Sequence, residues 1–83
     1  MKRLIYISTS SCEPCKAFAP VMTKAAESGI PVIKVNADIQ KTVLSEYQVR
    51  SVPTVVKVDS LGTMLDKFVG VRTLQEVINF YNA

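Results

Sequence analysis

Apolar residues recur along this chain with two different spacings. Four runs of six or seven residues, rich in β-branched and aromatic side chains, are typical of strands. Three other segments repeat their apolar positions every three or four residues, as helices do. The predicted elements, in chain order, are a strand over 3–8, a helix from about 12 to 28, a strand over 31–37, a short helix over 39–47, strands over 52–58 and 63–69, and a helix over 73–81.

Residues at the ends of these segments are typical of caps and turns. Pro14 suits the first turn of the first helix, because proline there loses no needed hydrogen bond. Asp38 is expected to cap the short helix, and Gly62 is free to take positive φ in the turn DSLG at 59–62. The segment TLQE at 73–76 is a capping box, which predicts the start of the last helix.

The element order β-α-β-α-β-β-α predicts an α/β fold. Its first β-α-β unit forms a right-handed parallel crossover, and its end is an antiparallel hairpin followed by a helix. A four-stranded mixed sheet flanked by three helices, with helices on both faces, follows from this order. We expect one domain over residues 1–83. The helical positions expected to face the core are Phe18, Val21, Met22, Ala25 and Ala26, then Val43, Leu44 and Tyr47, and finally Leu74, Val77, Ile78 and Tyr81.

Composition and charge argue against several classes of protein. The chain is 48% hydrophobic and 20% charged, and no stretch approaches the ~20 apolar residues of a membrane span. The net charge of +3 comes from scattered Lys and Arg residues, whereas nucleic-acid binding favours a clustered basic face. The start, MKRLIYISTSSC, has too short an apolar run for a signal peptide. We therefore expect a cytoplasmic protein that binds neither nucleic acid nor membrane.

The two cysteines, Cys12 and Cys15, lie where the first strand ends and the first helix begins. Open α/β sheets place their sites at the carboxyl ends of strands. Free N–H groups and the dipole at the helix start favour a thiolate at Cys12 and lower its pKa. Cys15 lies one turn further along the same face, where the two sulfurs can bond to each other. A CxxC pair near a βαβ pattern is typical of a redox site.

Two other interpretations of the cysteine pair stay open. A structural zinc site needs four ligands, and the chain has no His and no third Cys. A metal would therefore have to bridge two chains or use carboxylates. Two inert buried thiols are the other alternative, against which Pro14 and the predicted helix start argue. A permanent structural bridge is disfavoured, because the cytoplasm is reducing and so small a loop constrains the unfolded chain little.

Four segments, in order and at workable spacings, resemble the thioredoxin-fold family. They are CEPCKAFAP at 12–20, VIKVNAD at 32–38, EYQVRSVPTVVKV at 46–58 and KFVGVRT at 67–73. The resemblance runs from about Arg3 to Tyr81, which is nearly the whole chain. It implies a minimal member that lacks the N-terminal strand and helix of full-length thioredoxins, with a size similar to that of glutaredoxins.

The resemblance also assigns residues that face the cysteines. Pro53 falls on the family's cis-proline and should stand opposite the two sulfurs. It leaves the backbone of Val52 free to pair with an extended substrate segment, and Thr54 follows as in the family. Gly70 matches a glycine that lets a substrate backbone approach closely. The residues alone favour a strand start at Pro53 and a plain strand-end glycine at Gly70.

The chain departs from the family pattern near the cysteines. Ser11 replaces the usual Trp, which removes a flat apolar contact, and Glu13 replaces Gly. The charge of Glu13 should raise the pKa of the attacking cysteine and favour basic partners, or it merely suits a helix start. Tyr6 stands where thioredoxins have a buried Asp, so the thiol of Cys15 lacks that carboxylate base. Lys34 matches the lysine that pairs with this Asp, and we expect it to point to solvent rather than to hydrogen-bond Tyr6.

The resemblance implies a thiol–disulfide oxidoreductase that reduces protein disulfides without a bound cofactor or metal. Cys12 attacks the substrate disulfide, and Cys15 resolves the mixed disulfide. The expected partners are disulfide-containing proteins and, as electron donor, a thioredoxin reductase or glutathione, and a monomer is expected. Two alternatives stay open: a glutaredoxin-like enzyme that depends on glutathione, and a binding module that uses a thioredoxin scaffold without redox chemistry.

Overall fold

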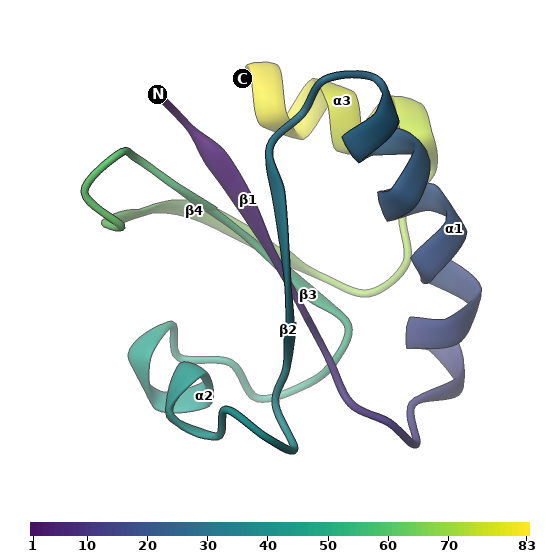
Figure 1. Cartoon of the computed structure of the whole chain (residues 1–83), viewed down its shortest axis with the longest axis vertical. Helices are drawn as coiled ribbons and strands as arrows, with labels where there is room; N and C mark the ends of the chain where they lie inside the picture. Colours follow the sequence, from purple (N-terminus) through teal and green to yellow (C-terminus); the bar gives the residue numbers. More distant parts are fainter.

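The computed structural model describes residues 1–83 and contains seven elements in the predicted order (Figure 1). The predicted fold class is confirmed, and only the short helix departs from its predicted bounds by more than two residues. The elements are β1 (Arg3–Ser8), α1 (Glu13–Glu27), β2 (Val32–Asn36), α2 (Thr42–Glu46), β3 (Thr54–Val58), β4 (Met64–Val69) and α3 (Leu74–Asn82).

The four strands form one mixed sheet in the order β2-β1-β3-β4. β1 is parallel to β2, and β3 is antiparallel to both β1 and β4. Ile7 near the end of β1 therefore pairs with Thr54 at the start of β3. This pairing brings the loop after β1, which leads to Cys12, next to the loop before β3, which carries Pro53.

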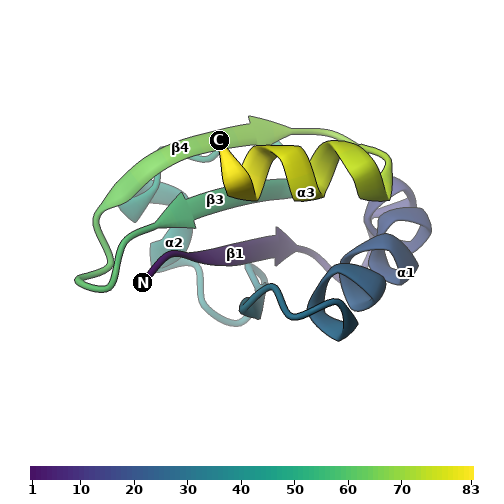
Figure 2. The same ribbon diagram turned by 90° about the horizontal axis from the view of Figure 1, so that it is seen from above.

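The sheet separates two helical layers. Figure 1 views the sheet from its β2 edge, with α1 and α3 on one side and α2 on the other, and Figure 2 shows α3 in front of the strands and α2 behind them. Side chains of β1 alternate between the two layers. Leu4 and Tyr6 belong to the core under α1 and α3, whereas Ile5 and Ile7 belong to the core under α2. Helices therefore cover both faces, as predicted.

Each of the two longer helices buries the apolar face that its sequence predicts, with one exception. In α1, Phe18, Met22 and Ala25 are fully buried. Burial of a side chain as large as that of Phe18 contributes roughly 2–3 kcal/mol. Ala26, predicted to face the core, is exposed, because it follows Ala25 directly and so points away from the sheet. Val77 is the buried centre of the apolar face of α3.

The structure corrects the prediction for the short helix. α2 begins at Thr42 rather than at residue 39, and no side chain caps its first turn. The carboxylate of Asp38 instead accepts a hydrogen bond from the N–H of Ser10 at 2.9 Å. The chain after β2 turns through main-chain hydrogen bonds to the carbonyl of Asn36. The last helix does carry the predicted capping box at its start.

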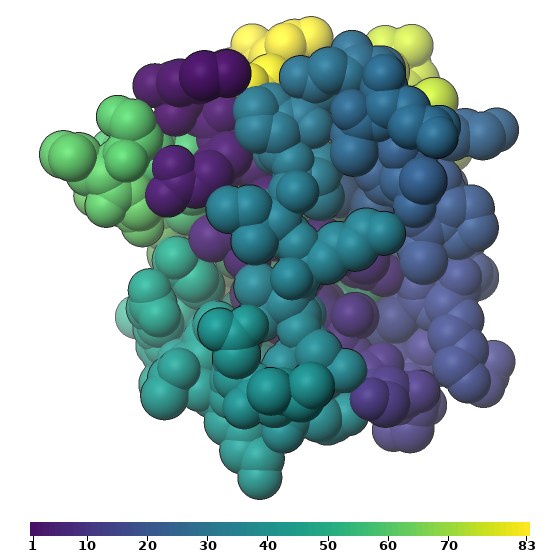
Figure 3. Space-filling view, viewed as in Figure 1, coloured from purple at the N-terminus to yellow at the C-terminus, as the bar shows by residue number.

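The two ends of the chain lie at one end of the molecule, and the start of α1 lies at the opposite end (Figure 1). In Figure 3, β2 and the loop after it, coloured blue to teal, form the surface nearest the viewer. β2 is therefore an exposed edge of the sheet. None of the three helices has both the length and the apolar character needed to cross a membrane.

Candidate active site

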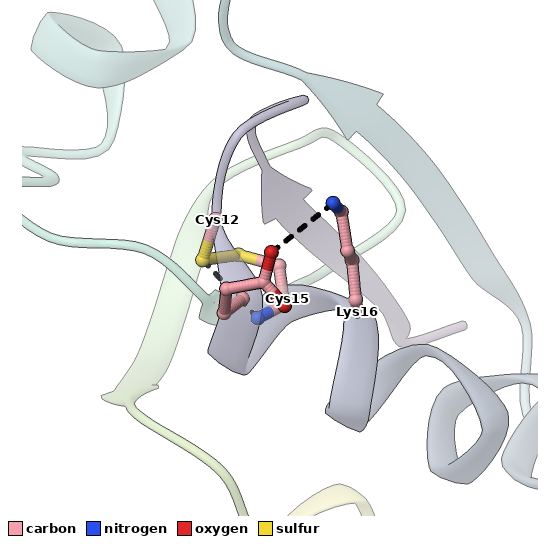
Figure 4. Close-up of polar contacts among 4 residues, drawn as sticks. Cys12, Cys15 and Lys16 are labelled. Atoms are coloured by element: carbon pink, nitrogen blue, oxygen red, sulfur yellow. Dashed lines mark hydrogen bonds and ion pairs between the residues drawn. A yellow bond between two sulfur atoms is a disulfide. The ribbon is translucent and has the colours of Figure 1, made fainter.

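Cys12 and Cys15 lie where β1 leads into α1. A disulfide joins them, and their Cα atoms are 5.2 Å apart (Figure 4). Cys12 stands at the N-cap of α1 and is partly buried, whereas Cys15 in the first turn is only 4% exposed. The two sulfurs thus reach each other, and Cys12 is the more accessible residue.

The sulfur of Cys12 caps the helix as a side-chain oxygen would. The main chain of Cys12 is extended, and its Sγ accepts a hydrogen bond from the N–H of Cys15 over 3.1 Å. Pro14 stands in the same turn, where its missing N–H has no intrahelical partner to lose. The N–H of Cys15 and the helix dipole also stabilise negative charge on Sγ once the disulfide is open. The site can therefore hold Cys12 as a thiolate.

Glu13 forms an ion pair within the first turn of α1. Its Oε1 lies 3.3 Å from the Nζ of Lys16, a contact drawn as a dashed line in Figure 4, and both side chains are exposed. An exposed pair of this kind contributes about 0–1 kcal/mol to stability. It places a positive charge next to Glu13, which reduces the repulsion between Glu13 and a thiolate at Cys12. This pair was not predicted from the sequence, although the i,i+3 spacing of Glu13 and Lys16 on a helix is a usable signal.

The loop before β3 stands opposite the disulfide. The peptide bond between Val52 and Pro53 is cis, as the resemblance implies. The carbonyl oxygen of Val52 lies 3.7 Å from the Sγ of Cys12. The hydroxyl of buried Thr54 donates to the carbonyl of Ser51 at 2.6 Å and helps to hold the loop. Neither the N–H nor the carbonyl of Val52 has a main-chain partner, so this segment is free to pair with another chain.

Gly70 closes the site on the side of β4. Its N–H donates to the carbonyl of Pro53 at 2.9 Å. Its φ is +95°, a value that L residues rarely adopt. A Cβ added here would meet only the guanidinium of Arg72, at 3.6 Å. In the free protein, the backbone conformation rather than lack of room therefore requires glycine at this position.

Tyr6 on β1 reaches the first turn of α1 from inside the core. It is 3% exposed, and its ring packs edge-on against Phe18 with 5.7 Å between the ring centroids. Its hydroxyl donates to the carbonyl of Cys15 at 2.8 Å. Burial raises the pKa of Tyr6 above its usual value of 10.0, so the hydroxyl stays protonated at neutral pH. Tyr6 therefore anchors the main chain of Cys15 and supplies no base.

Lys34 is the cross-strand neighbour of Tyr6 on β2, but the two side chains do not bond. The side chain of Lys34 is exposed, and its Nζ lies 3.4 Å from the hydroxyl of Thr23 on α1. Of the two predicted positions for Lys34, the structure has the solvent-exposed one. The reason is that β2 forms the edge of the sheet, where a long charged side chain can stay hydrated.

A polar network that the sequence analysis missed ties the loop before Cys12 to the end of β2. The N–H of Ser10 donates to Asp38, and the hydroxyl of Ser10 accepts from the side-chain amide of Asn36 at 3.1 Å. The amide oxygen of Asn36 accepts from the N–H of Asp38 at 2.8 Å. The available signal was a polar cluster after each of two parallel strands, since their carboxyl ends meet at one edge. The network holds the path of the chain toward the disulfide.

Comparisons with known proteins agree with this geometry. The thioredoxin family model matches residues 2–83. The thioredoxin of Porphyra purpurea is 37% identical over 76 residues, which cover 84% of this chain and 70% of that protein. The thioredoxin of Rickettsia bellii is 32% identical over 74 residues, which cover 86% of this chain and 70% of that protein. Among solved structures, a point mutant of the thioredoxin from Halobacterium salinarum has a TM-score of 0.89 at 27% identity, covering 98% of this chain and 72% of that one.

A CxxC pair that forms a disulfide on this fold defines a thiol–disulfide oxidoreductase. Because the family model spans nearly the whole chain, the protein belongs to the thioredoxin family. Its redox-active pair is Cys12 and Cys15. In this family generally, the substrates are disulfide-containing proteins, and a reductase returns electrons to the oxidised pair.

Proposed function

We propose that the protein reduces disulfides in other proteins, with Cys12 as the attacking and Cys15 as the resolving thiol. The observation that carries this proposal is the difference between the two residues. Cys12 is partly exposed and its sulfur accepts the N–H of Cys15, whereas Cys15 is 4% exposed. A thiolate that is both stabilised and accessible is the one that reaches a substrate disulfide first.

The proposed cycle transfers two electrons from the pair to the substrate. The Cys12 thiolate attacks one sulfur of the substrate disulfide, whose S–S bond breaks as a mixed disulfide forms and the first substrate thiolate leaves. The thiol of Cys15 then loses its proton, and its sulfur attacks the Sγ of Cys12. The second substrate thiolate leaves as the Cys12–Cys15 disulfide forms. Both substrate thiolates take up protons, and the pair ends oxidised.

We assign substrate binding to the loop before β3 and to Gly70. The main-chain polar groups of Val52 lack main-chain partners, and its carbonyl lies beside the Sγ of Cys12. An extended substrate segment can pair with these groups as an added strand does. Pro53 and Thr54 hold the loop in place, and Gly70, hydrogen-bonded to Pro53, offers a surface without a side chain.

Four further residues are proposed to tune the cycle. Glu13 and Pro14 shape the first turn of α1, and the charge of Glu13 acts on the thiolate. Tyr6 positions Cys15 without taking its proton, so this proton goes to water or to a leaving thiolate. Lys34 lies at the surface on the neighbouring strand and acts only through its charge.

We further propose that the protein works in the cytoplasm as a monomer, one domain over residues 1–83, without a bound cofactor. A reducing compartment supports this, because the oxidised pair must be reduced again after each cycle. The proposed electron donor is a flavin-dependent thioredoxin reductase. Glutathione is the alternative donor, and it would make the enzyme glutaredoxin-like.

The first test is the reduction potential of the Cys12–Cys15 pair, measured by equilibration in defined thiol buffers and trapping of free thiols. A value near ~−270 mV would support a thioredoxin-like reductant, and one near ~−200 to −230 mV a glutaredoxin-like one. If no disulfide forms between these cysteines at any buffer potential, the proposed redox function is wrong. The alternative, a binding module without redox chemistry, then takes its place.

The order of attack is tested with two single variants. Cys12→Ser should abolish reduction of a protein disulfide. Cys15→Ser should stop after the first step and accumulate a mixed disulfide, visible by mass spectrometry under non-reducing conditions. An adduct that forms on Cys15 in the Cys12→Ser variant, and none in Cys15→Ser, would reverse the assigned roles.

A further inference from the structure

Two hollows lie in the surface around the active site, and cations line both. The larger one, of about 710 Å³, lies between the segment that follows α2 and β4, and its lining includes Arg50 and Lys67. The smaller one, of about 290 Å³, lies between the first turns of α1 and β2. Cys15 forms part of its wall, together with Lys16 and Lys34. No Asp or Glu lines either hollow.

The hollows continue the surface proposed to hold the substrate. In the larger hollow, Ser51 directly precedes Val52, and Val69 pairs with Thr54 across β3 and β4. The smaller hollow begins at the disulfide itself, on the other side of the helix start. A segment that pairs with Val52 while its cysteine reaches Cys12 therefore has side chains within reach of both hollows.

Most of the positive charge in these hollows has no negative partner in the protein. Arg50 is exposed and makes no hydrogen bond or ion pair, and Lys34 makes one hydrogen bond, to a threonine hydroxyl at 3.4 Å. Lys67 donates to two main-chain carbonyls just after α2, at 3.1 and 2.6 Å. These bonds satisfy its N–H groups but leave its charge uncompensated, so three cations face a docking partner.

Two carboxylates lie in the segments around the disulfide, Glu13 and Asp38; only Glu13 has a cation as partner, and neither lines a hollow. Glu13 pairs with Lys16, and Asp38 accepts the N–H of Ser10. A partner with basic side chains would therefore meet uncompensated cations in both hollows and no free carboxylate in their linings. A partner with acidic side chains would meet opposite charge on either side of its cysteine.

We propose that the protein prefers substrate disulfides whose cysteines are flanked by Asp and Glu in an extended segment. This inference rests on the proposed function, since it concerns the segment that docks beside Cys12. An exposed ion pair contributes little, so each one should change kcat/KM by about 1.5- to 5-fold. Several together, with steering of the encounter, should give about 10-fold at low ionic strength. Salt should reduce the preference, because the Debye length is only ~8 Å at physiological ionic strength.

The test uses three peptides with the same disulfide-bonded core and either Glu, Gln or Lys at the flanking positions. The reduced protein reacts with each peptide in a single turnover at about 20 mM and at about 0.5 M salt, where electrostatic interactions are strong and weak respectively, and the second-order rate constant gives kcat/KM. We expect kcat/KM to fall in the order Glu, Gln, Lys. The ratio between the Glu and Lys peptides should be about 10-fold at low salt and about 3-fold or less at high salt.

Single-charge variants locate the preference. Arg50→Gln and Lys34→Gln each remove one exposed cation from a hollow, and each should lower the Glu-to-Lys ratio by about 2-fold at low salt. Lys24→Gln is the matched control. Lys24 is exposed in the last turn of α1, so its substitution removes the same charge far from the disulfide. The control should leave the ratio unchanged.

Each outcome separates this inference from the function on which it rests. Equal turnover of the three peptides, or a preference for Lys, would overturn the inference while the proposed function stands. A preference for Lys would instead show that Glu13 dominates. A ratio that falls as much in the Lys24→Gln control as in the hollow variants would assign the preference to net charge, which also overturns it. If the protein reduces none of the peptides, the proposed function fails first and the inference fails with it.

Discussion

Replacement of Tyr6 by Phe removes one hydroxyl from beneath the active-site turn and little else. The hydroxyl of Tyr6 is buried and donates to the carbonyl of Cys15 at 2.8 Å. The ring of Phe can keep the edge-on contact with Phe18. The substitution therefore isolates one hydrogen bond between the central strand β1 and the start of α1.

The expected loss follows from the fate of the carbonyl. A typical hydrogen bond contributes about 0.5–1.5 kcal/mol net, and a buried acceptor left without any partner costs about 1–3 kcal/mol. Helical geometry also directs the carbonyl of Cys15 toward the N–H of Ala19, so the carbonyl is not orphaned. We expect Tyr6→Phe to lower the free energy of unfolding by about 1–1.5 kcal/mol. For a domain of this size, that lowers Tm by roughly 4–12 °C.

The same variant tests whether Tyr6 acts on the redox chemistry. The hydroxyl bonds the main chain of Cys15 and not its sulfur, so the oxidised and reduced forms should lose equal stability. The reduction potential should then move by less than about 10 mV, which corresponds to about 0.5 kcal/mol. Urea unfolding of both forms and equilibration in thiol buffers measure these two quantities.

Tyr81→Phe is the matched control for this experiment. The hydroxyl of Tyr81 donates to the carbonyl of Lys2 at 3.1 Å, at the other end of the fold. It should cost no more than Tyr6→Phe and leave the potential unchanged. Wild-type stability in Tyr6→Phe, or a shift in reduction potential above about 30 mV, would contradict this prediction, since the hydroxyl would then either contribute nothing or favour one redox state.

Three further predictions concern α3 and two glycines. The hydrogen bond from the N-cap threonine holds the pKa of Glu76 below its usual 4.5. The ionised Glu76 therefore stabilises the fold above its unfolded-state pKa, and this stabilisation is lost as pH falls through the folded-state pKa. Glu76→Gln should make the free energy of unfolding, measured in urea, fall less steeply toward acid pH. An unchanged dependence of stability on pH would contradict this. Lys57→Met should lower the free energy of unfolding by about 1–3 kcal/mol in the same assay. The reason is that the buried ammonium donates at 2.9 and 3.0 Å to main-chain oxygens near the end of α3. Unchanged stability would mean that these bonds make no net contribution. Gly70→Ala and Gly29→Ala should each lower the free energy of unfolding by about 1–2 kcal/mol, since the φ values of these glycines are +95° and +102°. Only Gly70→Ala should slow the reduction of a protein disulfide. If both variants reduce it at the same rate, Gly70 is not part of the substrate-binding surface.

Local signals made most of the fold predictable. The β-branched run of β3 and the capping box of α3 depend on neighbours within a few residues, and both elements form within two residues of their predicted bounds. The short helix shows the limit of such signals. Asp38 has the local character of a cap, but its carboxylate accepts the N–H of Ser10, which is 28 residues away in the sequence. A long-range hydrogen bond competed with a weak local preference, and α2 began three residues later.

The closeness of the two cysteines follows from the sequence alone, and it favours a redox pair over a metal site or inert thiols. Cys12 and Cys15 are three residues apart at a strand–helix junction, and one helical turn brings their sulfurs together whatever else the chain does. The surroundings of the pair depend on which strands are neighbours. Pairing of β1 with β3 brings Val52 next to Cys12, and packing of α1 on the sheet brings the hydroxyl of Tyr6 under the first turn. Helical geometry acts over a few residues, whereas contacts between strands and charges from separate segments exist only once the whole sheet has formed.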